Sequence, residues 1–144
     1  MNHREATHKD LKVIKKLLYT GNLPSEDCDE HINNFIVVEN NEEIIAAGGI
    51  EVYGKIGLLR SIIVKPGHRE QGIGKLIVKL LEGKAHKLGV NELYLLTEST
   101  VDFFMMLGYS VVKKFELPIE IKKTRQFKEL CPASSKSMRH VIQY

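Results

Sequence analysis

The chain has 144 residues, of which 43% are hydrophobic and 27% are charged, and its formal net charge is +3. This size and composition are typical of one globular domain, here residues 1–144, and the mild charge gives no basis for nucleic-acid binding. No apolar run approaches the roughly 20 residues that a membrane helix needs, and the N-terminus has no apolar leader, so we expect a cytoplasmic protein without membrane contact. Its two cysteines lie far apart, so we expect no metal site.

The first third of the chain predicts one helix and the start of a β-meander. Apolar residues recur with helical spacing over Asp10–Tyr19, Thr7 precedes them as a cap, and Gly21 follows as a stop signal. A short acidic helix is expected over Ser25–Ile32. Three strands follow over residues 35–38, 44–53 and 56–64, joined by tight turns at Asn40-Asn41 and Gly54-Lys55.

The middle of the chain carries the strongest helical pattern. From Ile73 to Leu88 apolar residues recur every three or four positions, and Gly89 ends the helix. Residues 93–96 are apolar on both faces, as in a central strand, so strand, helix and strand form a βαβ unit with a right-handed crossover. We further expect a helix over 100–106, a strand over 109–115, a helix over 119–130 and an edge strand over 138–142.

The segment between the third strand and this helix has the character of an anion-binding site. Gly72 and Gly74 allow a large ligand to approach the main chain, and the unpaired amides of the first helical turn point at it. Ile73 stands where a Walker loop needs lysine, and Ile77 replaces the third glycine of a dinucleotide fingerprint. What remains is Arg-x-x-Gly-x-Gly over Arg69–Gly74; the alternative is a plain strand-to-helix turn with glycines for packing.

This segment, preceded by Val64-x-Pro66, resembles the coenzyme A signature of the GNAT superfamily of N-acetyltransferases. Further along, the family pattern Asn-x-x-Ala-x-x-Phe-Tyr-x-x-x-Gly-Phe is matched in spacing by residues 97–109, with Thr97 in place of Asn and Phe104 in place of Tyr. The resemblance implies an α/β GNAT fold, with a central mixed sheet of six or seven strands, helices on both faces, and acetyl-CoA as acetyl donor. Residues 48–53, 57–61, 124–127 and 130–134 resemble, more narrowly, the small members found with arsenic-resistance genes, which are similar to amino-acid N-acetyltransferases.

The resemblance also implies which residues contact the cofactor. Main-chain groups of Ile62 to Val64 pair with the pantetheine arm, and amides of Gln71 to Lys75 hold the diphosphate. The expected cofactor-binding residues are Ile62, Ile63, Val64, Arg69, Gln71, Gly72, Ile73, Gly74, Lys75, Thr97 and Phe103.

Catalytic residues follow from what acetyl transfer to an amine requires, namely a proton acceptor and a proton donor. Glu51 is the candidate base because it lies among apolar residues beside the motif strand, although alternation also allows a solvated position. In many relatives the tyrosine at position 104 protonates the thiolate, so Phe104 leaves that role to Ser61, Thr97, Ser99 or Tyr109. Thr97 is favoured because it occupies the family's Asn position.

Substrate contacts are expected from cationic side chains. Arg60 is unusual in an apolar strand and either clamps a substrate carboxylate bidentately or forms a salt bridge across the sheet. Ser61 and, at the substrate mouth, Arg139 complete the expected substrate-binding set, whereas His68 is expected to be an exposed turn residue.

The function predicted from the sequence is transfer of the acetyl group of acetyl-CoA to the amine of a small molecule by direct attack in a ternary complex. The substrate expected is an amino acid or an amino-acid analogue. Two alternatives remain: a non-catalytic acyl-CoA-binding sensor module, favoured by Phe104, and an acetyltransferase of protein lysines or N-termini. The expected partners are the small-molecule amine and a possible homodimer, without nucleic acid or membrane.

Overall fold

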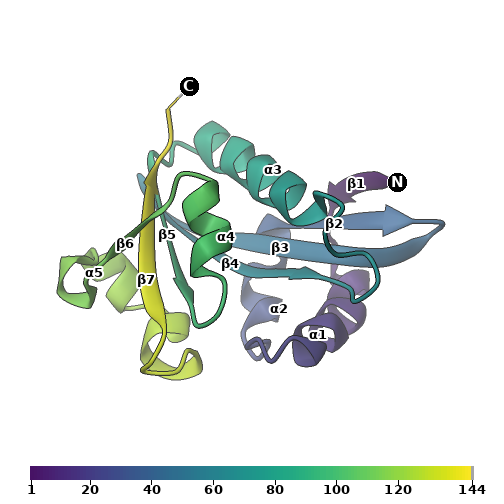
Figure 1. Cartoon of the computed structure of the whole chain (residues 1–144), viewed down its shortest axis with the longest axis horizontal. Helices are drawn as coiled ribbons and strands as arrows, with labels where there is room; N and C mark the ends of the chain where they lie inside the picture. The colour runs from purple at the N-terminus through teal and green to yellow at the C-terminus, as the bar shows by residue number, and fades with distance from the viewer. Residues whose placement is uncertain (144) are drawn as a thin grey trace. The chain divides into compact units, whose positions relative to one another are not determined.

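The computed structural model of the protein describes residues 1–143. They form a seven-stranded mixed sheet with the order β1-β2-β3-β4-β5-β7-β6 (Figure 1). None of the described helices combines the length and the apolar character needed to span a bilayer. The strands are β1 (Asn2–Glu5), β2 (Phe35–Asn40), β3 (Glu43–Tyr53), β4 (Ile56–Val64), β5 (Glu92–Thr97), β6 (Ser110–Val112) and β7 (Lys136–Val141).

Contacts divide the chain into two compact units. The first comprises residues 1–51 with 59–84, and the second comprises residues 52–58 with the chain from residue 85 onward. The single domain expected from the sequence stays a prediction. The helices are α1 (Leu11–Thr20), α2 (Cys28–His31), α3 (Ile73–Lys87), α4 (Val101–Met106) and α5 (Ile119–Lys122), with 3₁₀ turns at His8–Asp10, Ile32–Asn34 and Lys114–Glu116 and a π-helical turn at Gln126–Leu130.

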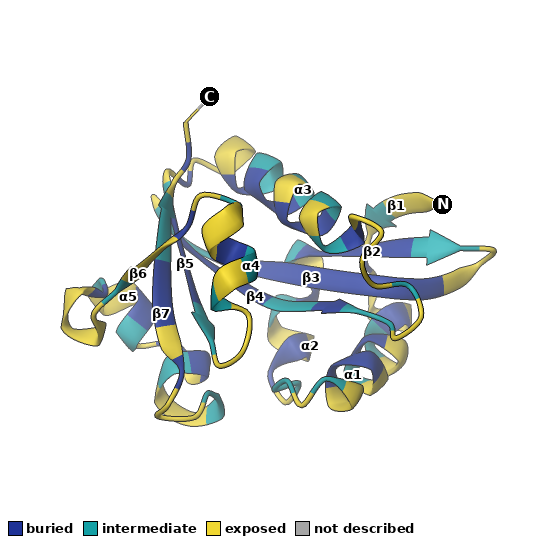
Figure 2. Cartoon of the chain, in the orientation of Figure 1, coloured by how far each residue is buried: buried dark blue, intermediate teal, exposed yellow. Residues whose placement is uncertain are grey.

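In the first unit, the strands have helices on both faces. Figure 2 shows β3 buried over most of its length. On one face, α1 packs into a core cluster that includes Phe35 and Ile63. On the other face, a Cβ at Gly48 would lie 2.6 Å from side-chain atoms of Ile62 and Ile77, so that α3 approaches β3 closely. The predicted mixed sheet with covering helices is therefore confirmed.

Three details of the first unit differ from the sequence-based expectation. The β2–β3 hairpin turns at Asn41 and Glu42, which have φ angles of 52° and 66°, one residue later than predicted. Thr7 does not cap α1 directly, because its amide donates to Asp10 Oδ2 at 2.7 Å in the 3₁₀ turn that precedes the helix. The predicted helix over 25–32 is shorter, since α2 begins at Cys28.

In the second unit, β5 is the central strand. It pairs in parallel with the first residues of β4 and antiparallel with β7, and its Leu93, Tyr94 and Leu95 are buried, as the apolar run predicted. The prediction that the last strand is an edge strand is wrong, because β7 pairs on its other side with β6. β6 is the edge strand and is shorter than predicted, since a 3₁₀ turn begins at Lys114.

The helix predicted over residues 119–130 is also wrong as one continuous element. α5 ends at Lys122, and a π-helical turn begins at Gln126. Between them, the buried Thr124 hydroxyl donates to the Ile121 carbonyl oxygen at 2.8 Å and accepts from the Phe127 amide at 3.2 Å. Such side-chain bonds replace main-chain helical bonds and end a regular helix.

Candidate active site

The loop between β4 and α3 leaves its main chain open. Gly67, Glu70 and Gly72 have positive φ angles of 95°, 65° and 78°, which turn the chain sharply. A Cβ at Gly67 or Gly72 would meet no atom within 4 Å, so the space beside both glycines is open. Arg69 Nε donates to the carbonyl oxygen of Val64 at 3.0 Å and thereby ties the loop to the end of the strand. A contact between Arg69 and a cofactor stays a prediction.

The loop delivers the chain into the N-terminus of α3, a helix of 15 residues. The Leu76 amide donates to the Gly72 carbonyl oxygen at 3.0 Å and begins the intrahelical bonding. The amides of Ile73, Gly74 and Lys75 precede that bond, so they have no intrahelical acceptor and lie at the positive end of the helix dipole. The buried side chain of Ile73 fixes this turn to the core. Three such amides beside an open loop suit a diphosphate.

The strand that leads to this loop contains an irregularity at Ser61. Its φ angle of 59° lies in the left-handed region, which is strained for a residue with a side chain in the middle of a strand. Beyond Ser61, the side chain of Ile62 packs over Gly48, whereas that of Ile63 packs over Gly21. Both side chains are therefore used in packing, and what this stretch can offer a ligand is its main chain.

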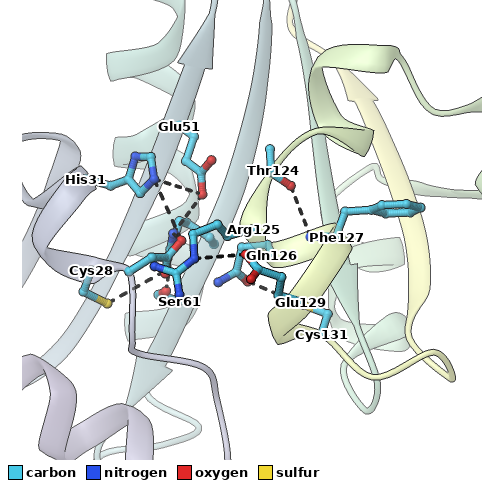
Figure 3. Close-up of polar contacts among 12 residues, drawn as sticks. Cys28, His31, Glu51, Ser61, Thr124, Arg125, Gln126, Phe127, Glu129 and Cys131 are labelled. Carbon is cyan, nitrogen blue, oxygen red and sulfur yellow. Dashed lines mark hydrogen bonds and ion pairs between the residues drawn. The ribbon is translucent and has the colours of Figure 1, made fainter.

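A buried cluster of charges lies against Ser61, and we call it the Arg60 cluster: Arg60, Asp27 and Glu51. Figure 3 labels Glu51 of this cluster and the neighbouring Ser61. Arg60 donates bidentately to Asp27, from Nη1 to Oδ2 at 2.7 Å and from Nη2 to Oδ1 at 2.5 Å. Nη1 also donates to Glu51 Oε2 at 2.8 Å, and Nε donates to Ser61 Oγ at 3.1 Å. One guanidinium thus joins the start of α2, strand β3 and the irregular residue of β4.

Two further side chains complete the surroundings of the Arg60 cluster. The Cys28 sulfur lies 3.8 Å from Arg60 Nη2, and burial raises the pKa of this thiol. His31 Nε2 lies 3.6 Å from Glu51 Oε2 and 3.9 Å from Asp27 Oδ2 (Figure 3). Asp27, Glu30 and His31 bring ligand atoms within 4.8 Å of one another, but both Asp27 oxygens already accept from a cation, so we assign no metal there.

The ionisation of the Arg60 cluster follows from its pairing. Burial alone would raise the pKa of Asp27, but hydrogen bonds and the charge of Arg60 hold that pKa below its ordinary value. Burial alone would lower the pKa of Arg60, but Asp27 and Glu51 together raise it. The cluster therefore keeps Arg60 as a cation and Asp27 as a carboxylate away from water.

These contacts correct one expectation about Arg60 and answer one question about Glu51. The external carboxylate expected for Arg60 depended on its having no acidic partner in the chain, and Asp27 and Glu51 are such partners. The alternative, a salt bridge across the sheet, is the arrangement found. Glu51 is 2% exposed, so the solvated position is excluded. Asp27, Cys28 and His31 were missed, because nothing in a short acidic helix indicates which side chain faces a distant arginine.

In the second unit, Thr97 ends β5 and begins the turn into α4. Its Oγ1 lies 2.5 Å from Thr100 Oγ1 and accepts from the Thr100 amide at 3.2 Å. Phe103 is half-buried and packs edge-on against Phe104, at 5.0 Å between ring centroids. Phe104 is buried and lies edge-on to Tyr109 at 5.5 Å. The position where many relatives carry a tyrosine therefore serves the packing of α4.

Arg139 lies on β7 opposite Tyr94, and its side chain reaches the end of β5 remote from Thr97. Its Nε donates to Oε1 of Glu92, the first residue of β5, at 2.9 Å, and its Nη2 contacts the same oxygen. This ion pair raises the pKa of Arg139. The expected place of Arg139 at a substrate mouth stays a prediction, and the structure gives it a carboxylate partner within the chain.

Comparisons with known proteins agree with this geometry. Residues 6–109 match the Acetyltransferase (GNAT) family model. An uncharacterized N-acetyltransferase of Chlorobaculum tepidum is 34% identical over 97 residues, 67% of this chain and 62% of that protein. An amino-acid acetyltransferase of Pasteurella multocida is 26% identical over 113 residues, 75% of this chain but only 26% of that protein. The chain thus spans less than two thirds of the length of these relatives.

Solved structures show the same fold. N-acetylglutamate synthase from Neisseria gonorrhoeae, complexed with coenzyme A and N-acetyl-glutamate, superposes with a TM-score of 0.86 at 19% identity, over 99% of this chain and 35% of that one. A Mycobacterium tuberculosis protein in complex with coenzyme A superposes with a TM-score of 0.83 at 22% identity, over 99% of this chain and 100% of that one. With the family model covering most of its length and the fold in agreement, the chain belongs to the GNAT family of acetyltransferases.

Proposed function

We propose that the protein transfers the acetyl group of acetyl-CoA to the amine of a small molecule. The observation that carries this proposal is the loop over residues 65–72, whose open glycines precede the free first-turn amides of α3. Coenzyme A is present in the similar structures from Neisseria gonorrhoeae and Mycobacterium tuberculosis. On this proposal, the amides of residues 71–75 hold the diphosphate, and main-chain groups of Ile62 to Val64 receive the pantetheine arm.

The chemistry requires one bond to form and one to break in a ternary complex. The neutral amine attacks the thioester carbonyl, the C–N bond forms, and the C–S bond breaks to release the thiolate. The attacking nitrogen loses one proton and the thiolate gains one. Glu51 lies on β3, the strand next to β4. It is the proposed base, because it is a buried carboxylate that Arg60 holds in one orientation.

Thr97 is the proposed donor of the proton to the thiolate. Phe104 has no hydroxyl and is buried against Tyr109, so it cannot fill the role. The Thr97 hydroxyl lies 2.5 Å from the exposed Thr100 hydroxyl. As Thr97 gives its proton to the thiolate, it takes one from Thr100, and Thr100 takes one from water. This hydroxyl pair offers a path that does not need the family's tyrosine.

The proposed substrate class is amino acids or their analogues. Its support comes from relatives named amino-acid acetyltransferases, such as that of Pasteurella multocida, and from the N-acetyl-glutamate bound to the similar Neisseria gonorrhoeae enzyme. Arg60 no longer supports this class, because Asp27 and Glu51 already neutralise it.

One experiment tests the activity and the substrate class together. Binding of acetyl-CoA is measured by isothermal titration calorimetry, and release of free thiol is then followed over a panel of amino acids, simple amines and peptides. We expect saturable binding and turnover with amino acids. No binding would overturn the proposal, and turnover restricted to peptides would identify a protein acetyltransferase. Binding without turnover on any amine would favour the sensor module, which Phe104 at the family's tyrosine position also favours.

A further inference from the structure

We propose that His31 is a proton-relay residue that takes the substrate's proton from Glu51 and delivers it to water. This inference rests on the proposed acetyl transfer with Glu51 as base. It concerns a residue that lies 20 positions from Glu51 in the sequence and that the family motifs do not include. What joins the two side chains is the geometry of the Arg60 cluster.

The first observation is the difference in exposure between the two groups. The Glu51 side chain is 2% exposed, whereas that of His31 is 23% exposed, and the two are 3.6 Å apart between Oε2 and Nε2 (Figure 3). A buried base that turns over repeatedly must lose each proton that it accepts. His31 is a titratable group that touches both Glu51 and solvent, so it connects them.

The second observation is the charge of the Arg60 cluster. Counted by formal charge, Arg60 contributes +1 and Asp27 and Glu51 each contribute −1, so these three buried residues sum to −1. Arg60 Nη1 donates to Glu51 Oε2 at 2.8 Å, and a charge-assisted hydrogen bond of this kind is weakened while Glu51 carries a proton. An imidazolium at His31 would bring the total to zero. A proton that Glu51 accepts therefore moves on to His31.

The remaining charged groups around His31 do not replace it. Asp27 precedes α2, is bound to Arg60 and lies 3.9 Å from Nε2. Cys28 is a buried thiol whose raised pKa keeps it protonated. On the outer side, Lys15 of α1 is paired with the exposed Asp29, and the exposed Glu30 brings a carboxylate oxygen within 4.8 Å of the ligand atoms of His31 and Asp27. Of these groups, an imidazole is the one whose charge ordinarily changes between pH 5 and 8.

The relay conserves protons at each step. The substrate ammonium gives one proton to the Glu51 carboxylate, and the neutral amine attacks the thioester. The second proton, which the nitrogen loses after attack, balances the proton that the thiolate gains. The Glu51 carboxyl then gives the first proton to neutral His31 and returns to its carboxylate form. The His31 imidazolium loses it to water, so that no other reactant is needed.

The first test is the pH dependence of turnover in His31→Gln, with His8→Gln as the matched control in an exposed 3₁₀ turn. We expect kcat at pH 7 to fall about tenfold or more in His31→Gln, since relays and bases typically contribute factors of that size. The wild type should lose activity as pH falls and imidazole becomes protonated, and His31→Gln should lack this limb. His8→Gln should match the wild type, and acetyl-CoA affinity should be unchanged in both variants.

The second test is chemical rescue, which a purely structural role would not produce. His31→Ala is assayed with and without added imidazole, and folding is verified by acetyl-CoA binding. We expect imidazole to restore at least part of the lost activity, with a dependence on its unprotonated form. The relay would be overturned if His31→Gln had wild-type kcat values and the same fall of activity at low pH. It would also be overturned if imidazole did not restore the activity that His31→Ala loses. Absence of turnover in the wild type would instead refute the proposed function.

Discussion

Arg60 is held in the interior by two carboxylates, and removing it would leave both without their cation. We expect Arg60→Met to lower the free energy of unfolding by about 3–5 kcal/mol at neutral pH, because a buried pair that loses one partner leaves an uncompensated charge. Lys15→Met is the control, since its pair with Asp29 is exposed and screened by water, so its loss should change the free energy of unfolding much less. Urea denaturation of both variants measures the difference.

The pH dependence of that loss has a definite sign. Arg60 lowers the pKa of Asp27 in the folded protein. The Asp27 carboxylate therefore stabilises the wild type at pH values above the unfolded pKa of about 3.9, and this stabilisation is lost only as pH falls through the lower folded pKa. In Arg60→Met, burial raises the Asp27 pKa instead. The stability gap between wild type and variant should therefore narrow as pH falls from 7 towards 4, and a constant gap would contradict this account.

Glu51 is the second residue with a direct test. Glu51→Gln keeps the size of the side chain and a carbonyl oxygen for Arg60 but removes the basic carboxylate. If Glu51 is the base, kcat should fall on the order of 100-fold or more, whereas acetyl-CoA binding should survive. Steady-state kinetics and calorimetry measure the two quantities. A fall under about threefold would leave the amine's proton to water or to the substrate itself.

The candidate site was only partly predictable from the sequence. Arg69, Gly72 and Gly74 are contiguous, so their spacing alone identified the loop. Asp27 and His31 reach Glu51 and Arg60 only through the tertiary fold, and a single sequence contains no pattern that joins positions so far apart. The sequence raised the question of what neutralises Arg60, and the fold supplied the partner.

At the scale of elements, predictability followed the length and regularity of the pattern. α3 carries its apolar repeat over four turns, and its bounds agree with the sequence-based expectation. The segment over 119–130 has a helical composition, but the Thr124 hydroxyl competes for main-chain groups in its middle and divides it. β1 was missed because its polar residues have no apolar alternation, and its pairing partner β2 lies 30 residues away.

Close packing of β3 gives an element-scale prediction. A Cβ at Gly49 would lie 2.4 Å from ring atoms of Phe35, which is fully buried beneath the Arg60 guanidinium. We expect Gly49→Ala to destabilise the protein by about 1–3 kcal/mol, as overpacking of cores does. Gly83→Ala in α3 meets no atom within 4 Å and should instead stabilise by up to about 1 kcal/mol, since alanine favours helices. Thermal unfolding of both variants would show opposite shifts.

At the scale of the whole molecule, binding and folding are linked. Acetyl-CoA should raise the melting temperature, because it binds the folded state, and the stabilisation should grow with the logarithm of one plus its concentration over its dissociation constant. Gly74→Glu places bulk and negative charge where the first-turn amides of α3 would hold the diphosphate, so the protection should disappear. Gly83→Glu makes the same change nine residues further along this helix, and acetyl-CoA should still raise the melting temperature of this variant. Equal protection of Gly74→Glu and wild type would place the cofactor elsewhere.

The two edges of the sheet have a consequence for handling the protein at high concentration. An exposed strand edge is a template on which other chains can add, which is how soluble proteins convert to fibres. β1 is four residues long and carries Arg4 and Glu5, and β6 is three residues long and runs directly into Lys113 and Lys114. Short, charged borders of this kind give an incoming strand few unpaired groups and an electrostatic penalty. We therefore expect the concentrated protein to resist ordered aggregation for as long as it stays folded.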